Sequence, residues 1–200
     1  MELYIVRHGR TVWNKAGLIQ GTSDVELLPE GIEMAEKTGE GLKDIHFDAV
    51  YSSPLSRAYD TAALILKGRD QEIIREPLLM EMGFGVCEGQ LYAPGENGDP
   101  LEGFYNSPDT YQAPEGGENF YDINKRAEAF LESMSQRYKG DERILVVAHA
   151  AINQAIFRIM DQLPMKELWK HGRQLNCAVT VCQQQKDGWK IVERNRIFYD

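Results

Sequence analysis

Residues 3–14, with the sequence LYIVRHGRTVWN, join an apolar run to a charged segment. The apolar run, residues 3–6, is typical of a short, fully buried strand in a parallel sheet. It ends at Arg7 and His8. In open α/β sheets ligands bind just outside the carboxyl ends of the strands, so both side chains are candidates for a functional site.

The rest of the chain alternates between strand and helix patterns. Further strands are predicted at 47–53, 72–76 and 143–150, and helices at 29–43, 54–66, 118–137 and 151–160. The end of the chain is typical of a hairpin, with strands at 175–184 and 188–198. This alternation predicts the α/β class, as a three-layer α/β/α sandwich whose central sheet is mostly parallel, with an antiparallel edge near the C-terminus.

The length of 200 residues suits one domain, and we expect residues 1–200 to form it. Residues 81–117 are rich in glycine and proline and have few periodic apolar positions. They are expected to form an irregular lid or insertion with at most one short helix. The predicted helix at 54–66 carries two start signals, Ser53 as N-cap and Pro54 at the first helical position.

The composition restricts the partners. A formal net charge of −9 argues against general affinity for nucleic acid or for an anionic membrane, both of which require a basic face. No apolar stretch approaches the roughly 20 residues of a membrane span. The three cysteines lack metal-ligand spacing, and Cys177 and Cys182 would point to opposite faces of one predicted strand. We therefore expect free thiols, no metal and a cytoplasmic location.

Two of the four histidines occur in matching contexts. His8 follows the first strand and His149 ends the strand at 143–150, and a small residue follows each of them. A single histidine at a strand end is more often a hydrogen-bonded structural residue. The repeated context favours a shared pocket, because parallel strands can bring their carboxyl ends together.

Arg7, Arg57 and Glu81 are further candidates. Arg57 lies near the start of the predicted helix at 54–66, and two guanidiniums beside a helix N-terminus would suit a phosphoryl dianion. Most arginines on helices are surface residues, but one in the first turn opposes the helix dipole unless an anion offsets it. Glu81 lies between apolar residues, where desolvation would raise its pKa toward general-acid duty, although most loop glutamates are solvated.

Five segments, in order along the chain, resemble the histidine phosphatase superfamily, the phosphoglycerate-mutase-like proteins. VRHGRTVWN (6–14) is similar to the family's Arg-His-Gly signature, and YSSPLSRAYDTA (51–62) to its second-arginine motif. LMEMGFGVCEG (79–89) is similar to the acid segment. PEGGENFYDINKR (114–126) is similar to the Gly-Glu-Ser segment, with Asn119 in place of Ser, and VVAHAAI (146–152) to the second-histidine motif.

The resemblance implies a role for each matched residue. His8 would be the nucleophile that forms a phosphohistidine, and Glu81 would be the proton donor. The catalytic residues Arg7, Arg57 and His149 would bind the phosphoryl group. The residues implied to bind the substrate are Arg7, Asn14, Gln20, Gly21, Arg57, Glu81 and Ala150. Neither a metal nor another cofactor is implied.

Three positions depart from the family pattern. Arg10 stands where Glu or Gln is common, and we expect its charge at the pocket rim to favour substrates with a second anionic group. Ala150 and Ala151 replace small residues such as Gly after the second histidine, which would tighten the pocket floor. Leu28 replaces the usual Thr or Ser before the first long helix, at the loss of an N-cap contributing about 1 kcal/mol.

The resemblance therefore implies a metal-independent phosphatase that hydrolyses a small phosphorylated metabolite. A cofactor-dependent phosphoglycerate mutase is the alternative within the family, but 81–89 lacks the basic stretch that follows the acid in the mutase branch. A non-catalytic phosphate-binding module is the alternative from another class. The family includes monomers, dimers and tetramers, and a homodimer is compatible with the sequence.

Overall fold

The computed structural model describes residues 1–92 and 99–200 and contains a six-stranded mixed sheet in the order β3-β2-β4-β1-β5-β6. The strands are β1 (Glu2–Arg7), β2 (Ala49–Ser52), β3 (Ile74–Arg75), β4 (Arg143–Ala148), β5 (Val179–Gln185) and β6 (Gly188–Arg196). The first four are parallel, whereas β5 is antiparallel to β1 and β6 is antiparallel to β5. The predicted sheet, including its antiparallel edge, is confirmed.

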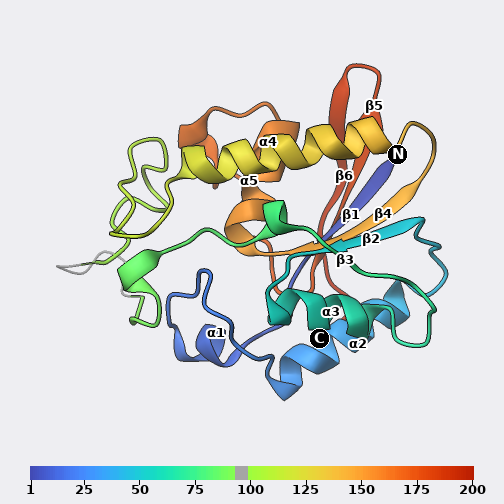
Figure 1. Cartoon of the computed structure of the whole chain (residues 1–200), viewed down its shortest axis with the longest axis horizontal. Coiled ribbons are helices and arrows are strands. Elements are labelled where there is room, and N and C mark those ends of the chain that lie inside the picture. The colour runs from blue at the N-terminus through green and yellow to red at the C-terminus, as the bar shows by residue number, and fades with distance from the viewer. Residues whose placement is uncertain (93–98) are drawn as a thin grey trace.

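Helices cover both faces of the sheet, as Figure 1 shows, with α2 and α3 on one side and α4 and α5 on the other. The α-helices are α1 (Val12–Ala16), α2 (Pro29–Gly41), α3 (Ser56–Ile65), α4 (Phe120–Arg137) and α5 (Ala150–Met160). Short 3-10 helices are η1 (Pro77–Leu79), η2 (Gly85–Cys87) and η3 (Met165–Glu167). This is the predicted three-layer arrangement.

The alternation of side chains along β1 divides the core into two parts. Leu3 and Ile5 pack in one core with α4 and α5, whereas Val6 packs in the other with α2 and α3. Successive side chains of a strand point to opposite faces, so a strand buried on both faces must be apolar throughout. Because both faces of β1 are covered, its carboxyl end is held rigidly.

The start of α3 differs from the prediction. The helix begins at Ser56, after Leu55, and no side chain caps it. Ser53 was expected to be the N-cap, but its Oγ instead lies 2.8 Å from Nε2 of His149. The predicted cap is therefore wrong, because residues 54–55 form a bend that separates Ser53 from the helix.

Two other local features bear on the predictions. Cys177 precedes β5 with a φ of 53°, so the prediction that it shares a strand with Cys182 is wrong. Its N–H donates to the carbonyl of Arg7, which ties this turn to the end of β1. The loss of an N-cap at Leu28 is confirmed, since no side chain caps α2.

The described part of 81–117 contains the short helix η2 and is otherwise irregular. It packs onto the domain through aromatic rings. Phe104 stacks at centroid distances of 4.9–5.5 Å on a set of neighbours, Phe84, Tyr105, Tyr111, Phe120 and Trp169. The remaining residues of the predicted lid, 93–98, lie outside the described residues.

Within residues 1–92 and 99–200, no helix has both the length and the apolar character needed to cross a membrane.

Candidate active site

The carboxyl ends of β1 and β4 bring two histidines together. The strands are parallel neighbours with Arg7 opposite Ala148, so the next residues, His8 and His149, also lie side by side. Their ring centroids are 5.1 Å apart, and both side chains are buried. The two histidines predicted to meet at the strand ends are therefore neighbours in the fold.

The hydrogen bonding of His8 selects one tautomer. Nδ1 lies 2.7 Å from the carbonyl oxygen of Gly9, which can only accept, so Nδ1 carries the proton and Nε2 keeps its lone pair. Burial, followed by the charges of Arg57 and Arg7, lowers the pKa of His8 well below its ordinary value. At neutral pH the ring is uncharged, the state in which an imidazole is nucleophilic.

His149 is the N-cap residue of α5 and pairs with Ser53. Ser53 Oγ accepts from the N–H of Leu55 at 3.4 Å, which leaves its own proton free to donate to Nε2 of His149. When that hydroxyl donates to Nε2, the proton of the neutral ring is on Nδ1, which is buried without a hydrogen-bond partner among the described residues. Burial, followed by the charge of Arg57, lowers the pKa of His149 well below its ordinary value.

Two buried arginines lie beside the histidines. Nη1 of Arg7 donates to the carbonyl of Gln174 at 2.9 Å, and Arg57 donates to the carbonyls of Ser23 and Gly21, both at 2.7 Å. The Nε of each arginine is buried and unpaired within the described part of the chain. Desolvation lowers the pKa of both to about 10, so both stay charged at neutral pH. Buried cations with unused donors suit an anionic ligand.

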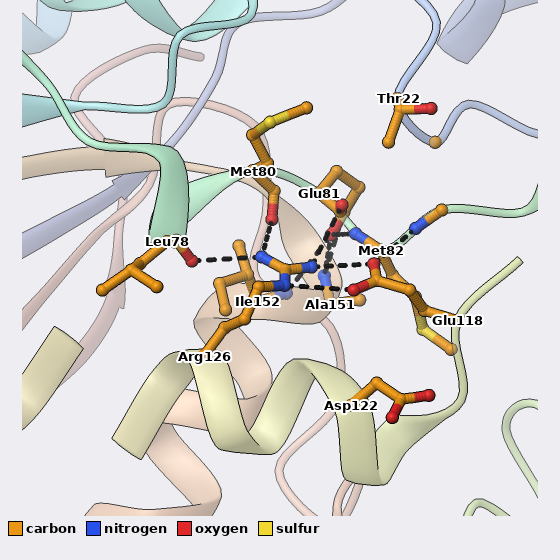
Figure 2. Close-up of polar contacts among 12 residues, drawn as sticks. Thr22, Leu78, Met80, Glu81, Met82, Glu118, Asp122, Arg126, Ala151 and Ile152 are labelled. Atoms are coloured by element: carbon orange, nitrogen blue, oxygen red, sulfur yellow. Dashed lines mark hydrogen bonds and ion pairs between the residues drawn. The ribbon is translucent and has the colours of Figure 1, made fainter. Parts of the chain in front are cut away.

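Glu81 lies at the N-terminus of α5, as the close-up in Figure 2 shows. Its carboxylate accepts the backbone N–H groups of Met82 at 2.9 Å, Ala151 at 3.1 Å and Ile152 at 3.2 Å. A helix N-terminus with free N–H groups stabilises a carboxylate. The side chain is 6% exposed and reaches the same cavity as His8.

An ion pair holds the backbone that carries Glu81 (Figure 2). Arg126 pairs with Glu118 at 2.8 Å and donates to the carbonyls of Leu78 and Met80 at 3.1 and 2.7 Å. Glu118 in turn accepts the N–H of Gly83 at 2.9 Å. The predicted Gly-Glu-Ser-like segment thus clamps the acid segment from both sides of Glu81. The matched motif contained both residues, but nothing in the sequence indicated that they pair with each other around Glu81.

Asn14 and Gln20 belong to a second polar cluster at the cavity. Nδ2 of Asn14 and Oγ1 of Thr11 both donate to Oε1 of Gln20, at 3.2 and 2.7 Å. Asn176 donates to the carbonyl of His8 at 2.9 Å, and the hydroxyl of Tyr199 donates to the carbonyl of Asn176. The sequence had not indicated Asn176 or Tyr199, because neither lies in a recognisable motif.

Gly9 is explained by packing against α2. A Cβ on Gly9 would lie 2.6 Å from the carbonyl oxygen of Gly31, and one on Gly31 would lie 2.2 Å from that of Arg10. Neither glycine has a positive φ. Both are therefore small because the backbone after β1 crosses directly over the first turn of α2.

A cavity of about 510 Å³ opens beside these groups. Of the predicted site residues, Arg7, His8, Asn14, Gln20, Glu81 and Ala150 line it. Arg57, His149 and Gly21 are not among the lining residues, but the His149 ring lies beside that of His8 and the carbonyl of Gly21 holds Arg57. The far wall is aromatic, formed by Phe84, Tyr92, Phe104, Tyr105 and Trp169.

Arg10 lines the cavity as predicted, but its guanidinium pairs with Glu30 at 3.4 Å and is partly exposed. Its charge is therefore already partly balanced. Within the described ranges, no group of three or more Cys, His, Asp or Glu side chains could hold a metal ion.

Known proteins resemble this chain in sequence and in fold. The sequence profile of the histidine phosphatase superfamily (branch 1) matches residues 3–197. A metal-independent phosphoserine phosphatase of Arabidopsis thaliana is 34% identical over 95% of this chain and 79% of its own length. An adenosylcobalamin/alpha-ribazole phosphatase of Salmonella typhimurium is 31% identical over 92% of each chain. The solved structure of Bacillus stearothermophilus YhfR has a TM-score of 0.91 at 28% identity, covering 98% of this chain and 97% of that one.

Buried arginines around a neutral histidine, at the carboxyl edge of an α/β sheet, define an enzyme-like site for a phosphoryl group. With the profile match over nearly its whole length, the chain belongs to the histidine phosphatase superfamily.

Proposed function

We propose that this protein is a metal-independent phosphatase that hydrolyses a small phosphomonoester through a phosphohistidine on His8. The observation that carries the proposal is the state of His8, whose Nδ1 is bound to the Gly9 carbonyl and whose ring is neutral. The relatives named above are phosphatases, which supports the same reaction for this chain.

In the first step Nε2 of His8 attacks phosphorus, and the bond from phosphorus to the alcohol oxygen breaks. Charge spreads over the equatorial oxygens, and Arg7, Arg57 and Nδ1–H of His149 stabilise it. Each of these groups has a buried donor without a partner among the described residues. Glu81 donates a proton to the departing alcohol oxygen.

In the second step the Glu81 carboxylate takes a proton from a water molecule that attacks phosphorus. The bond between phosphorus and Nε2 breaks, inorganic phosphate leaves, and the histidine lone pair is restored. Asn14 and Gln20, which line the cavity, would bind the phosphate or the adjoining part of the substrate.

Hydrolysis, as opposed to mutase activity, is supported by the relatives named above, which are phosphatases. It is also supported by residues 81–89, which lack the basic stretch of the mutase branch. A mutase must exclude water from the same intermediate. The aromatic part of 81–117 forms much of the far wall, and we propose that this segment is a lid on the single domain.

The cytoplasmic location is part of the proposal, since all three cysteines are free thiols.

The test is hydrolysis of p-nitrophenyl phosphate by the wild-type protein and by His8→Ala. We expect turnover in the wild type and none in the variant, and acid-labile phosphate on the wild-type protein after rapid quenching. Activity that survives in His8→Ala would contradict the proposal. Mutase activity is tested by incubation with 3-phosphoglycerate and a trace of the 2,3-bisphosphate. If the isomer formed faster than phosphate was released, the protein would be a mutase and not a phosphatase.

A further inference from the structure

One cation at the cavity, Arg173, has no part in the proposed reaction. It lines the cavity, is exposed, and makes no hydrogen bond or ion pair with any residue in 1–92 or 99–200. The other arginines at the site differ in this respect. Arg10 pairs with Glu30, Arg7 is held by the Gln174 carbonyl, and Arg57 is held by two backbone carbonyls.

The position of Arg173 is set by its neighbour. Gln174 is 3% exposed, and its carbonyl accepts from Nη1 of Arg7 at 2.9 Å. The Gln174 side chain donates to the carbonyls of Ile5 and Ala178, both at 2.9 Å. Arg173 is therefore fixed one residue from the contact that anchors Arg7. Burial is the main reason that the pKa of Arg7 is lowered, and the positive charge of Arg173 lowers it further. The two charges therefore interact.

Among residues 1–92 and 99–200, the charges around the cavity leave Arg173 without a counterion. Among the lining residues Glu81 is the acid, and its carboxylate already accepts three backbone N–H groups. A phosphoryl dianion would be balanced by Arg7 and Arg57. One positive charge then remains, at the wall of the cavity that the alcohol part of the substrate must enter.

We propose that Arg173 binds a carboxylate on the alcohol part of the substrate, so that the enzyme prefers phosphate esters of hydroxy acids. The inference rests on the proposed function and identifies the substrate class of the same site. A singly charged, planar carboxylate matches one guanidinium in charge and in bidentate geometry. A second phosphate dianion would require more cations than this one. The role expected for Arg10 from the sequence is thus assigned to Arg173, which has no acid partner in the part of the chain that the structure describes.

Two substrate pairs isolate the carboxylate. Phosphoserine and phosphoethanolamine differ only by this group, and 3-phosphoglycerate differs from glycerol 3-phosphate by a carboxylate in place of a hydroxymethyl. We expect the wild type to prefer the acid in at least one pair by about tenfold or more in kcat/KM. In Arg173→Gln the preference should largely disappear, through loss of kcat/KM for the acid alone. Arg173→Lys should retain part of it.

Matched variants identify the residue responsible. Arg143→Gln removes the same charge at the amino end of β4, the opposite edge of the sheet, and should leave the preference intact. Arg10→Gln tests the competing assignment. The proposal would be overturned if the wild type showed no preference in either pair, or if the preference survived in Arg173→Gln. It would also be overturned if the preference disappeared in Arg10→Gln and not in Arg173→Gln.

Measurements of substrate binding test the carboxylate contact independently of the proposed reaction. Dissociation constants for the same pairs, measured by calorimetry on His8→Ala and on His8→Ala/Arg173→Gln, do not require turnover. Tighter binding of the acid that is lost with Arg173 would support the carboxylate contact even if p-nitrophenyl phosphate were not hydrolysed. Equal binding of both members by His8→Ala would refute the contact even in an active phosphatase.

Discussion

The two neutral histidines link the stability of the protein to pH. His8 and His149 both have a pKa well below the ordinary value, mainly because they are buried. The unfolded chain would protonate both near pH 6.5, whereas the folded protein would not. Folding free energy should therefore be fully present above about pH 6.5 and decline below it, with a limit of about 1.4 kcal/mol per pH unit for each histidine.

Chemical denaturation between about pH 8 and about pH 5 measures this dependence. We expect His8→Gln/His149→Gln to have a shallower decline than the wild type. His46→Gln provides the control, because His46 is exposed and should not alter the slope. Equal slopes in the wild type and the double variant would show that the two rings are not neutral in the fold.

Ser53 determines which nitrogen of His149 carries the proton. Without the hydroxyl, Nε2 has no donor and the other tautomer becomes accessible, which would remove Nδ1–H from the phosphoryl site. We expect Ser53→Ala to lower kcat by about 10- to 100-fold with little change in KM. Ser53→Thr keeps the hydroxyl and should restore most of the activity. A Ser53→Ala enzyme with wild-type kcat and an unchanged pH profile would remove Ser53 from the mechanism.

At the scale of elements, the ion pair between Arg126 of α4 and Glu118, just before this helix, positions Glu81. Arg126 and Glu118 hold the backbone on both sides of Glu81 (Figure 2). We expect Arg126→Met to lower stability by about 1–3 kcal/mol, because the carbonyls of Leu78, Met80 and Glu81 lose their donor. It should also lower kcat more than it weakens phosphate binding, because Glu81 is displaced while the arginines are not.

Lys125→Met is the matched control, since Lys125 is exposed on the same helix and pairs only distantly with Asp122. Its kcat and melting temperature should equal those of the wild type. If Arg126→Met altered the melting temperature alone, the clamp would be structural and without influence on Glu81.

The elements also show where sequence patterns were sufficient. β1 and β4 were predicted because both are buried on two faces and so are apolar throughout. The start of α3 was predicted wrongly, because Ser-Pro is a common helix start. Only the position of His149 shows that Ser53 forms a hydrogen bond with this histidine and does not cap the helix. The short helix α1 was missed because it has no buried residue and hence no apolar periodicity.

At the scale of the whole molecule, an acidic chain concentrates its buried cations at one site. The net charge is −9, yet Arg7 and Arg57 are buried together beside the cavity. Burial disfavours the charge of each guanidinium, so an anion that binds to both should stabilise the fold. Inorganic phosphate at about 100 times its dissociation constant should add about 2.7 kcal/mol to the free energy of unfolding.

Thermal denaturation with and without phosphate measures this effect, and Arg57→Lys, which keeps the charge but loses the planar fork, should reduce it. Chelators should change neither the melting temperature nor the activity. A marked loss of activity in EDTA would contradict a metal-free reaction.

The sequence by itself determined the layered fold and the groups that carry the proposed chemistry. Apolar runs specify buried strands, and Arg7, His8, Arg57 and His149 fall at strand or helix ends that a parallel sheet brings to one edge. Glu81 lies in a loop and was identified by the resemblance of its segment to the family's acid segment. Only the tertiary structure decided which groups are free to act. The Ser53–His149 bond, the Arg126–Glu118 clamp and the unpaired state of Arg173 depend on contacts between distant segments. Local patterns do not encode such contacts, because whether a charge is paired depends on what the fold places beside it.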